Sequence, residues 1–168
     1  AVAEPTAVSL HAVLMAENSS KKSLPECRVL VQGAGAIGLL CALVLSKIKD
    51  AKNITISDPN KLRLDECAKY VEGKFVNPNN KEINNDGFDI VFDTVGLEIS
   101  RQQAISVVKP GGIIIHIGLT QPSGQFNFRK ATLQEITFIG TYCYTNKDFK
   151  NTINILANKE IGDLNWIE

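Results

Sequence analysis

The sequence has no long hydrophobic run and no excess of either charge. Lys plus Arg and Asp plus Glu each number 18, so the formal net charge is zero. This balance is not typical of proteins that bind nucleic acid or acidic membranes. No apolar stretch approaches the roughly 20 residues of a bilayer-spanning helix. We therefore expect neither a nucleic-acid partner nor a membrane partner.

Clustered cysteines are also lacking. Cys27, Cys41, Cys67 and Cys143 are scattered, without a CxxC pair or a group of Cys and His ligands. Such spacing is typical of reduced, mostly buried thiols inside a cell, and it does not predict a zinc site made from these four residues. The N-terminus has neither the basic start nor the cleavage site of a secretory signal. We expect a cytoplasmic protein.

Helical and strand-like patterns alternate along the 168 residues. Several strand-like segments are nearly continuous runs of Val and Ile, as in strands that are buried on both faces. The alternation predicts a three-layer α/β fold with a six-stranded, mostly parallel, doubly wound sheet. Strands are predicted at 27–33, 53–58, 74–77, 88–96, 111–119 and 135–142, and helices at 5–16, 36–48, 60–70, 100–108 and 146–158.

A glycine-rich segment, GAGAIG, follows the first predicted strand and opens a helix. It contains Gly33, Gly35 and Gly38. Glycine lets the backbone approach a pyrophosphate closely, and a helix N-terminus supplies aligned N–H donors. The motif alone is weak, but Asp58 ends the next strand, twenty residues after Gly38. A carboxylate there can accept both hydroxyls of an adenosine ribose, so we predict a Rossmann-type dinucleotide site.

Asp58 has a second possible role, as the N-cap of the helix that begins near Asn60, and the two roles are compatible. Its negative charge would repel a 2′-phosphate, which favours NAD over NADP. Arg63 works against this preference if it serves a 2′-phosphate. It could instead lie along the adenosine or be a solvated charge on the helix surface.

Two other interpretations use the same glycine turn. S-adenosylmethionine methyltransferases also have a glycine-rich turn and an acid after the second strand, and they usually end on an antiparallel hairpin strand. A non-catalytic dinucleotide-binding domain is the other alternative. Tyr70 and Lys74 have the YxxxK spacing of short-chain dehydrogenases. That pair follows the second strand here instead of lying much later, so we predict a core Tyr70 and a solvent-facing Lys74.

Six segments together resemble the cofactor domain of medium-chain, zinc-dependent alcohol and polyol dehydrogenases. The resemblance implies one dinucleotide-binding domain over residues 1–168, in which residues 1–20 form a leading helix that faces a missing catalytic domain. It implies hydride transfer between a small alcohol or polyol and NAD in a longer protein, of which this chain would be an inactive fragment. The segments are EPTAVSLHAV, VLVQGAGAIGLLCALVLSK, ITISDPNKLRL, FDIVFDTVG, VVKPGGIIIHIGL and EITFIGTYCYTNKDF, in the order of the family.

The resemblance also assigns cofactor contacts to particular residues. The three glycines would hold the pyrophosphate, with Ala36 and Ile37 at the helix mouth and Ile37 supporting the nicotinamide. Asp58 would bind the ribose and Arg63 would lie beside it. Further contacts would come from the ends of later strands, at Thr94, Val95, Gly96, Ile117, Gly118, Leu119, Thr141 and Tyr142.

Glu4 in the motif EPTAV would face the catalytic zinc, although Thr6 replaces the usual leucine. The other zinc ligands lie in the missing domain, so no zinc is expected in this fragment. Glu4 could instead be an acid that interacts with the dipole at the start of a helix. We expect His11 to be a packed or half-buried histidine, and His116 to face the core or the cofactor.

Residues 123–129 alternate polar and aromatic side chains, including Phe126 and Phe128. In the family, the equivalent edge can pair with a second subunit and extend the sheet. The resemblance therefore implies a homo-oligomer, a dimer or a tetramer, formed through an edge strand near 123–129. A plain loop that holds two buried aromatic residues is the alternative.

Overall fold

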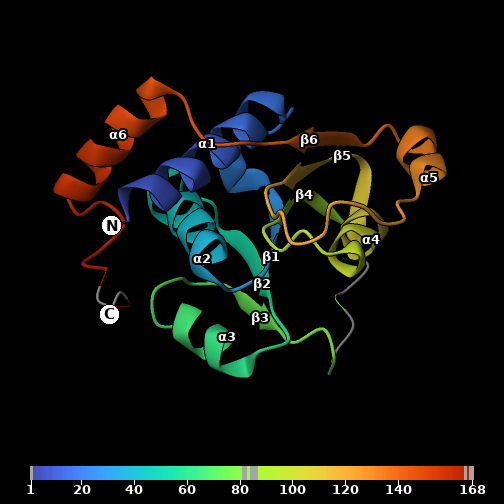
Figure 1. The fold of residues 1–168 in the computed structure, drawn as a ribbon, viewed down its shortest axis with the longest axis horizontal. Coiled ribbons are helices and arrows are strands. Elements are labelled where there is room, and N and C mark those ends of the chain that lie inside the picture. The colour runs from blue at the N-terminus through green and yellow to red at the C-terminus, as the bar shows by residue number, and fades with distance from the viewer. Residues whose placement is uncertain (1, 81–82, 84–86, 165, 167–168) are drawn as a thin grey trace.

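The computed structural model describes residues 2–80, 83, 87–164 and 166. Six strands form one sheet in the order β3-β2-β1-β4-β5-β6, and all five neighbouring pairs are parallel (Figure 1). This is the predicted doubly wound α/β fold, which is confirmed. The strands are β1 (Arg28–Gln32), β2 (Asn53–Ser57), β3 (Lys74–Val76), β4 (Phe88–Asp93), β5 (Val108–His116) and β6 (Thr137–Gly140).

The five predicted helices occur in the predicted order, and the structure adds a short helix, α5, that was not predicted. A 3₁₀ turn (Leu24–Glu26) precedes β1, and a π-helical segment (Val44–Ile48) continues α2. Among the described residues, no helix combines the length and the hydrophobicity needed to cross a bilayer. The α-helices are α1 (Ala3–Ser19), α2 (Ala36–Leu43), α3 (Lys61–Cys67), α4 (Glu98–Val107), α5 (Phe128–Leu133) and α6 (Asn146–Ala157).

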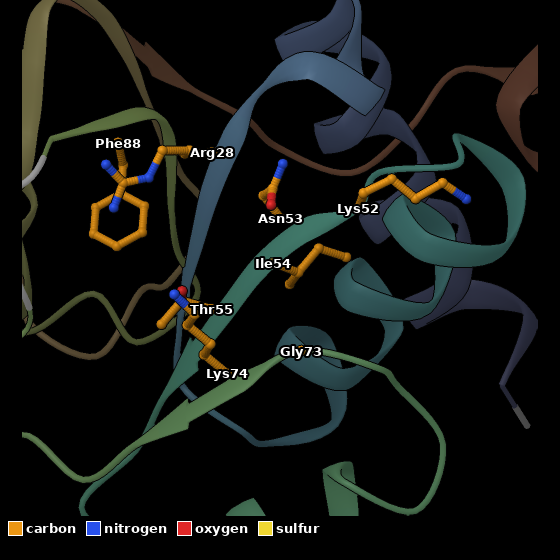
Figure 2. Close-up of a pocket in the computed structure, with 8 residues that line it drawn as sticks. All are labelled: Arg28, Lys52, Asn53, Ile54, Thr55, Gly73, Lys74 and Phe88. Carbon is orange, nitrogen blue, oxygen red and sulfur yellow. The ribbon is translucent and has the colours of Figure 1, made fainter.

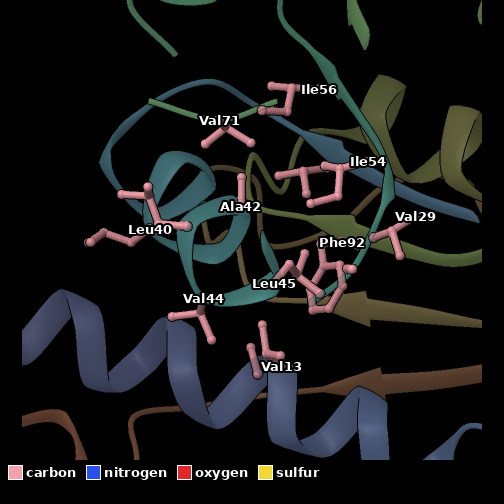
Figure 3. Packing of buried hydrophobic residues seen from close by; sticks show 14 of the residues in the cluster. Val13, Val29, Leu40, Ala42, Val44, Leu45, Ile54, Ile56, Val71 and Phe92 are labelled. Atoms are coloured by element: carbon pink, nitrogen blue, oxygen red, sulfur yellow. The ribbon is translucent and has the colours of Figure 1, made fainter. Parts of the chain in front are cut away.

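The two faces of the sheet are covered by separate hydrophobic clusters. Along β1, Val29 and Val31 belong to the cluster that contains α1 and α2 (Figure 3), whereas Leu30 belongs to the cluster that contains α4. Successive strand residues point to opposite faces, so apolar residues are required at every position. This explains the continuous Val and Ile runs of the sequence.

Helix α1 is buried around most of its circumference. Ala7, Leu10, Ala12, Val13 and Ala16 are all at most 3% exposed. Both α2 and α6 contact this helix, so apolar residues are needed around most of its circumference. The first and last helices of the chain therefore lie side by side on one face of the sheet (Figure 1).

Two details of the predicted helices are corrected by the structure. Helix α3 ends at Cys67, three residues earlier than predicted. The helical pattern predicted that Leu62 faces inward, but Leu62 is 78% exposed and Leu64 is buried in its place. Cys27, Cys41 and Cys67 are buried as expected, but Cys143 is exposed.

The predicted edge strand near 123–129 does not form. The side chain of Asn127 accepts a hydrogen bond from the backbone N–H of Lys130 at 2.9 Å and thereby caps α5, which begins at Phe128. This cap ends the extended segment in the middle of the polar–aromatic alternation. Phe126 is half-buried, but Phe128 is 72% exposed, so the alternative of two buried aromatic residues is also only half correct. The two edge strands of the described sheet are β3 and β6, and β6 is the one next to β5.

Candidate functional site

The glycine turn joins β1 to α2 at the carboxyl edge of the sheet. Gly33 has a φ of +96°, and its N–H donates to Ser57 O on β2 at 2.7 Å. A Cβ on Gly38 would lie 1.9 Å from Gly33 O, so the helix can approach the strand only with glycine there. A Cβ on Gly35, in contrast, would meet no atom within 4 Å.

The N-terminus of α2 has donors available for a ligand. Gly35 is its N-cap and provides no side-chain cap, so the first-turn N–H groups are left without an intrahelical acceptor. Ala36 is exposed and Ile37 is half-buried. An anion in the open space beside Gly35 would meet these donors and the positive end of the helix dipole.

Asp58 follows β2 and is directly linked to the turn. Its Oδ2 accepts the backbone N–H of Ala34 at 2.8 Å, and its Oδ1 accepts the N–H of Asn60 at 2.7 Å. Asn60, not Asp58, is the N-cap of α3, because its side chain accepts the N–H groups of Leu62 and Arg63. A carboxylate has about four acceptor positions, so Asp58 keeps capacity for two hydroxyl donors.

Arg63 is 61% exposed on α3, and its Nη1 lies 3.9 Å from Asp58 Oδ2. The guanidinium is therefore balanced by the nearest carboxylate.

A cavity of about 260 Å³ opens beside the turn. Gln32 and Gly33 form its β1 side, Pro59 its β2 side, and Val95 and Leu97 its β4 side. Ligands of open parallel sheets bind at this edge, where the order of the strands reverses. Here the reversal lies between β1 and β4, which are adjacent in the sheet.

The loops after β4 and β5 are in close contact. Thr94 Oγ1 donates to Gln32 O at 2.6 Å, which holds the end of β4 against β1. A Cβ on Gly96, which has a φ of +73°, would lie 2.1 Å from Gly118 O. Val95, Gly96, Ile117 and Gly118 therefore lie together in the loops after β4 and β5, beside the turn.

Asp93, at the end of β4, was not singled out from the sequence. It is fully buried, and its Oδ1 accepts the N–H groups of Val95 and Gly96 at 3.1 and 2.9 Å. Its Oδ2 lies 2.9 Å from His116 Nδ1. His116 is thus half-buried at the end of β5 and is tied to the cofactor edge. An acid at the end of an apolar strand was the available signal for Asp93.

Three predicted residues lie at the margin of this edge. The N–H of Thr141 donates to His116 O at 3.0 Å, which places it just beyond the end of β6. Leu119 and Tyr142 are 77% and 80% exposed. Glu4 is exposed in the first turn of α1. Among the described residues, no three His, Cys, Asp or Glu side chains form a possible metal site.

A second cavity, of about 220 Å³, lies at the amino-terminal ends of the strands, on the side of the sheet opposite to the glycine turn (Figure 2). Its walls include Arg28, Asn53, Lys74 and Phe88, which are the first residues of β1, β2, β3 and β4. The guanidinium carbon of Arg28 lies 5.4 Å from the centre of the Phe88 ring. This cavity is therefore separated from the glycine turn by the length of the strands.

Comparison with known proteins agrees with this geometry. Residues 36–158 match the family described as zinc-binding dehydrogenase. The chain belongs to this family. The fold and the family together identify it as the NAD(P)-binding part of a medium-chain, zinc-dependent dehydrogenase. The methyltransferase alternative is set aside, because the match is to a dehydrogenase family and all of the sheet pairs described are parallel.

The zinc-binding dehydrogenase relatives include sugar and polyol enzymes. A probable D-xylulose reductase A from Neosartorya fischeri is 31% identical over 174 residues, which cover 96% of this chain and 47% of that protein. The D-xylulose reductase of Saccharomyces cerevisiae is 28% identical with the same coverage. The structure of L-idonate 5-dehydrogenase from Escherichia coli superposes with a TM-score of 0.85 and 26% identity, covering 96% of this chain and 46% of that one. The chain spans about half the length of the curated relatives it matches.

Proposed function

We propose that this chain holds NAD for hydride transfer between a small alcohol or polyol and the cofactor in a longer dehydrogenase. The observation that carries the proposal is the link between the glycine turn and Asp58. The Ala34 N–H is bound to the same carboxylate that would accept the ribose hydroxyls. One residue therefore fixes the pyrophosphate turn and the ribose position relative to each other.

The residues present fit a dinucleotide. The space beside Gly35 and the uncapped start of α2 suit a pyrophosphate, and the cavity lined by Pro59, Val95 and Leu97 offers apolar walls for a base. Thr94, Val95, Gly96, Ile117, Gly118, Leu119, Thr141 and Tyr142 would then surround the second nucleotide half, together with Ile37. When bound, NAD supplies the acceptor for a hydride from the carbinol carbon. This chain orients the cofactor and excludes water from one of its faces.

The charge next to the ribose favours NAD over NADP. Asp58 would repel a 2′-phosphate, and Arg63 lies 3.9 Å from the carboxylate that neutralises it. The pair is therefore a poor acceptor for an additional phosphate dianion.

We further propose that residues 1–168 form one domain whose leading helix, within residues 1–20, faces the catalytic part of the longer protein. Glu4 would face the zinc from this helix, and the remaining ligands would come from that catalytic part. The polyol class of substrate is inferred from the relatives described as D-xylulose reductases.

A fluorescence titration of this chain with NADH tests the proposal. We expect enhanced, blue-shifted NADH emission with weak affinity, weaker binding of NADPH, and no binding of S-adenosylmethionine. We also expect no alcohol oxidation by the chain alone, because it lacks a complete metal site among its described residues. Binding of S-adenosylmethionine without NADH, or equal affinities for NADH and NADPH, would contradict the proposal.

The edge of the sheet supports a second proposal, that two copies of the chain associate through β6. A groove of about 560 Å³ beside this edge strand is lined by Phe126, Phe128 and Phe138, and its other end reaches Gly118 and Leu119 at the cofactor edge. The Phe126 ring centre lies 5.2 Å from that of Phe128 and 5.4 Å from that of Phe138. Edge strands carry unpaired backbone groups, and apolar side chains beside them favour strand addition by an identical chain.

A further inference from the structure

A buried arginine connects the two loops at the second half of the cofactor edge. Arg101, on α4, is 9% exposed. Its Nη1 donates to Gly96 O at 3.0 Å and to Gln121 O at 3.2 Å, and its Nη2 donates to Ser123 O at 2.6 Å. All three acceptors are backbone carbonyls. The guanidinium therefore connects the loop after β4 to the loop after β5.

Other hydrogen bonds follow the same path between the two loops. The N–H of Gln121 donates to Gly96 O at 2.9 Å, and Gln121 Oε1 accepts the N–H of Glu98 at 2.6 Å. Thr120 Oγ1 donates to Val95 O at 2.6 Å. Residues 95–98 and 120–123 thus form one bonded unit. Among the described residues, two buried charged side chains contact it: Arg101 from α4, and Asp93, whose Oδ1 accepts the N–H groups of Val95 and Gly96.

A buried cation that pairs with carbonyls instead of a carboxylate requires a physical reason. Removing a charge from water is unfavourable, and an apolar side chain would fill the same volume without that penalty. A guanidinium, however, presents five donors in a rigid plane and can hold carbonyls from two segments at fixed positions. The arrangement therefore favours a role in loop geometry over a role in packing alone.

The position of the bonded unit suggests what it orients. A doubly wound sheet binds a dinucleotide with one mononucleotide on each half. Asp58 lies on the β1–β2–β3 half, where it would take the adenosine ribose. Gly96 and Gly118 lie in the loops that follow β4 and β5, so the second nucleotide would lie over the loops that Arg101 joins.

We propose that Arg101 is a positioning residue that orders the loops after β4 and β5 before the cofactor binds. The inference rests on the proposed NAD-binding function. If the loops are already ordered, binding does not have to supply the entropy of fixing them. Removing the guanidinium should therefore weaken the hold on the nicotinamide nucleotide and leave the hold on the adenosine half unchanged.

Binding of NADH and of ADP-ribose to this chain separates the two halves. In Arg101→Met, we expect NADH affinity to fall by about tenfold and ADP-ribose affinity to change by less than about twofold, since charged hydrogen bonds are removed from one half only. The blue shift of bound NADH should also diminish. Arg129→Met is the matched control, because Arg129 is exposed, and both affinities should be unchanged.

Arg101→Lys keeps the experiment decisive if the methionine variant does not fold. Lysine retains the charge, but its three donors sit on one nitrogen and cannot hold both loops, so we expect NADH affinity to fall by about threefold with unchanged ADP-ribose affinity. An equal loss for both ligands would show a purely structural role and overturn the inference, as would unchanged NADH binding. If the unaltered chain bound neither ligand, the proposed function itself would be wrong.

Discussion

Asp58 Oδ2 lies 2.8 Å from the backbone nitrogen of Ala34, so the acid after β2 is bound to the middle of the glycine turn. Asp58 also accepts the N–H of Asn60, and it is 4% exposed. Two backbone N–H donors, of which that of Ala34 is buried, therefore depend on one carboxylate. The residue predicted to bind a ribose also holds the shape of the turn.

Replacement of Asp58 should consequently affect both stability and binding. We expect Asp58→Ala to lower the free energy of unfolding by about 1–3 kcal/mol, because the buried N–H of Ala34 and the partly buried N–H of Asn60 both lose their acceptor. NADH affinity should fall by at least about tenfold, as expected for the loss of a charged acceptor. Denaturant unfolding and NADH titration measure the two effects. Asp65→Ala, which removes an exposed carboxylate paired with Lys61, should change neither, and unaltered stability of Asp58→Ala would contradict the structural role.

The glycines of the turn should separate folding from binding. In Gly38→Ala, the new methyl group would meet Gly33 O at 1.9 Å, and we expect a loss of about 2 kcal/mol or more in stability. Gly35 has a φ of −80° and open space around its Cβ position. Gly35→Ala should therefore fold with a change within about 0.5 kcal/mol but bind NADH more weakly. Normal NADH binding by Gly35→Ala would indicate that the pyrophosphate lies elsewhere.

Association through β6 should depend on its exposed aromatic residue. Phe138 and Ile153 are both 44% exposed, but Phe138 lies on β6 and Ile153 lies on α6. We expect Phe138→Asp to shift the chain to a monomer in sedimentation equilibrium, because a charge placed in an apolar interface is left without a partner. Ile153→Asp should leave the association unchanged. A monomeric unaltered chain at high concentration would refute pairing through this edge.

The contact between α1 and α6 should make the free energy of unfolding fall at acidic pH. Asp148 Oδ2 lies 2.8 Å from His11 Nδ1 and accepts the N–H and the hydroxyl of Thr145 at 2.9 and 2.7 Å. Burial raises the pKa of Asp148, but the hydrogen bonds from Thr145 and the contact with His11 outweigh it, so the pKa lies below its ordinary value. A carboxyl with a depressed pKa in the folded state stabilises the fold above its unfolded pKa, near 4.

Thermal unfolding at several pH values tests this. At pH 5 to 7, Asp148→Ala should melt at a lower temperature than the unaltered chain. The corresponding loss in the free energy of unfolding should be about 1–3 kcal/mol. The difference should shrink as the pH falls below about 4, because the native carboxyl then becomes protonated. Asp163→Ala, which removes an exposed carboxylate paired with Lys159, is the control and should have little effect. A difference that does not depend on pH would show that charge is unimportant at this contact.

The sequence predicted the order of the elements, the glycine turn and the acid after β2, because each depends on local chemistry. It did not predict the inward face of α3, since Leu62 and Leu64 both fit a helical stripe and only the sheet decides which is buried. The role of Arg101 was missed for a related reason. It lies on the same face of α4 as Ala104 and Ile105, both buried, but a single charged residue in a helix usually faces solvent. Its three acceptors lie on loops that only the tertiary fold brings together.

The side-by-side packing of α1 and α6 has a consequence for the order of folding. The bond from His11 to Asp148 spans 137 positions, so it closes a loop almost as long as the chain, and such contacts have a large entropic penalty early in folding. The β1–β2–β3 half can form from neighbouring segments. The first helix, in contrast, has to wait for the last one before its second face is covered. During synthesis, α1 emerges long before α6 and would thus be among the last of these helices to complete its packing.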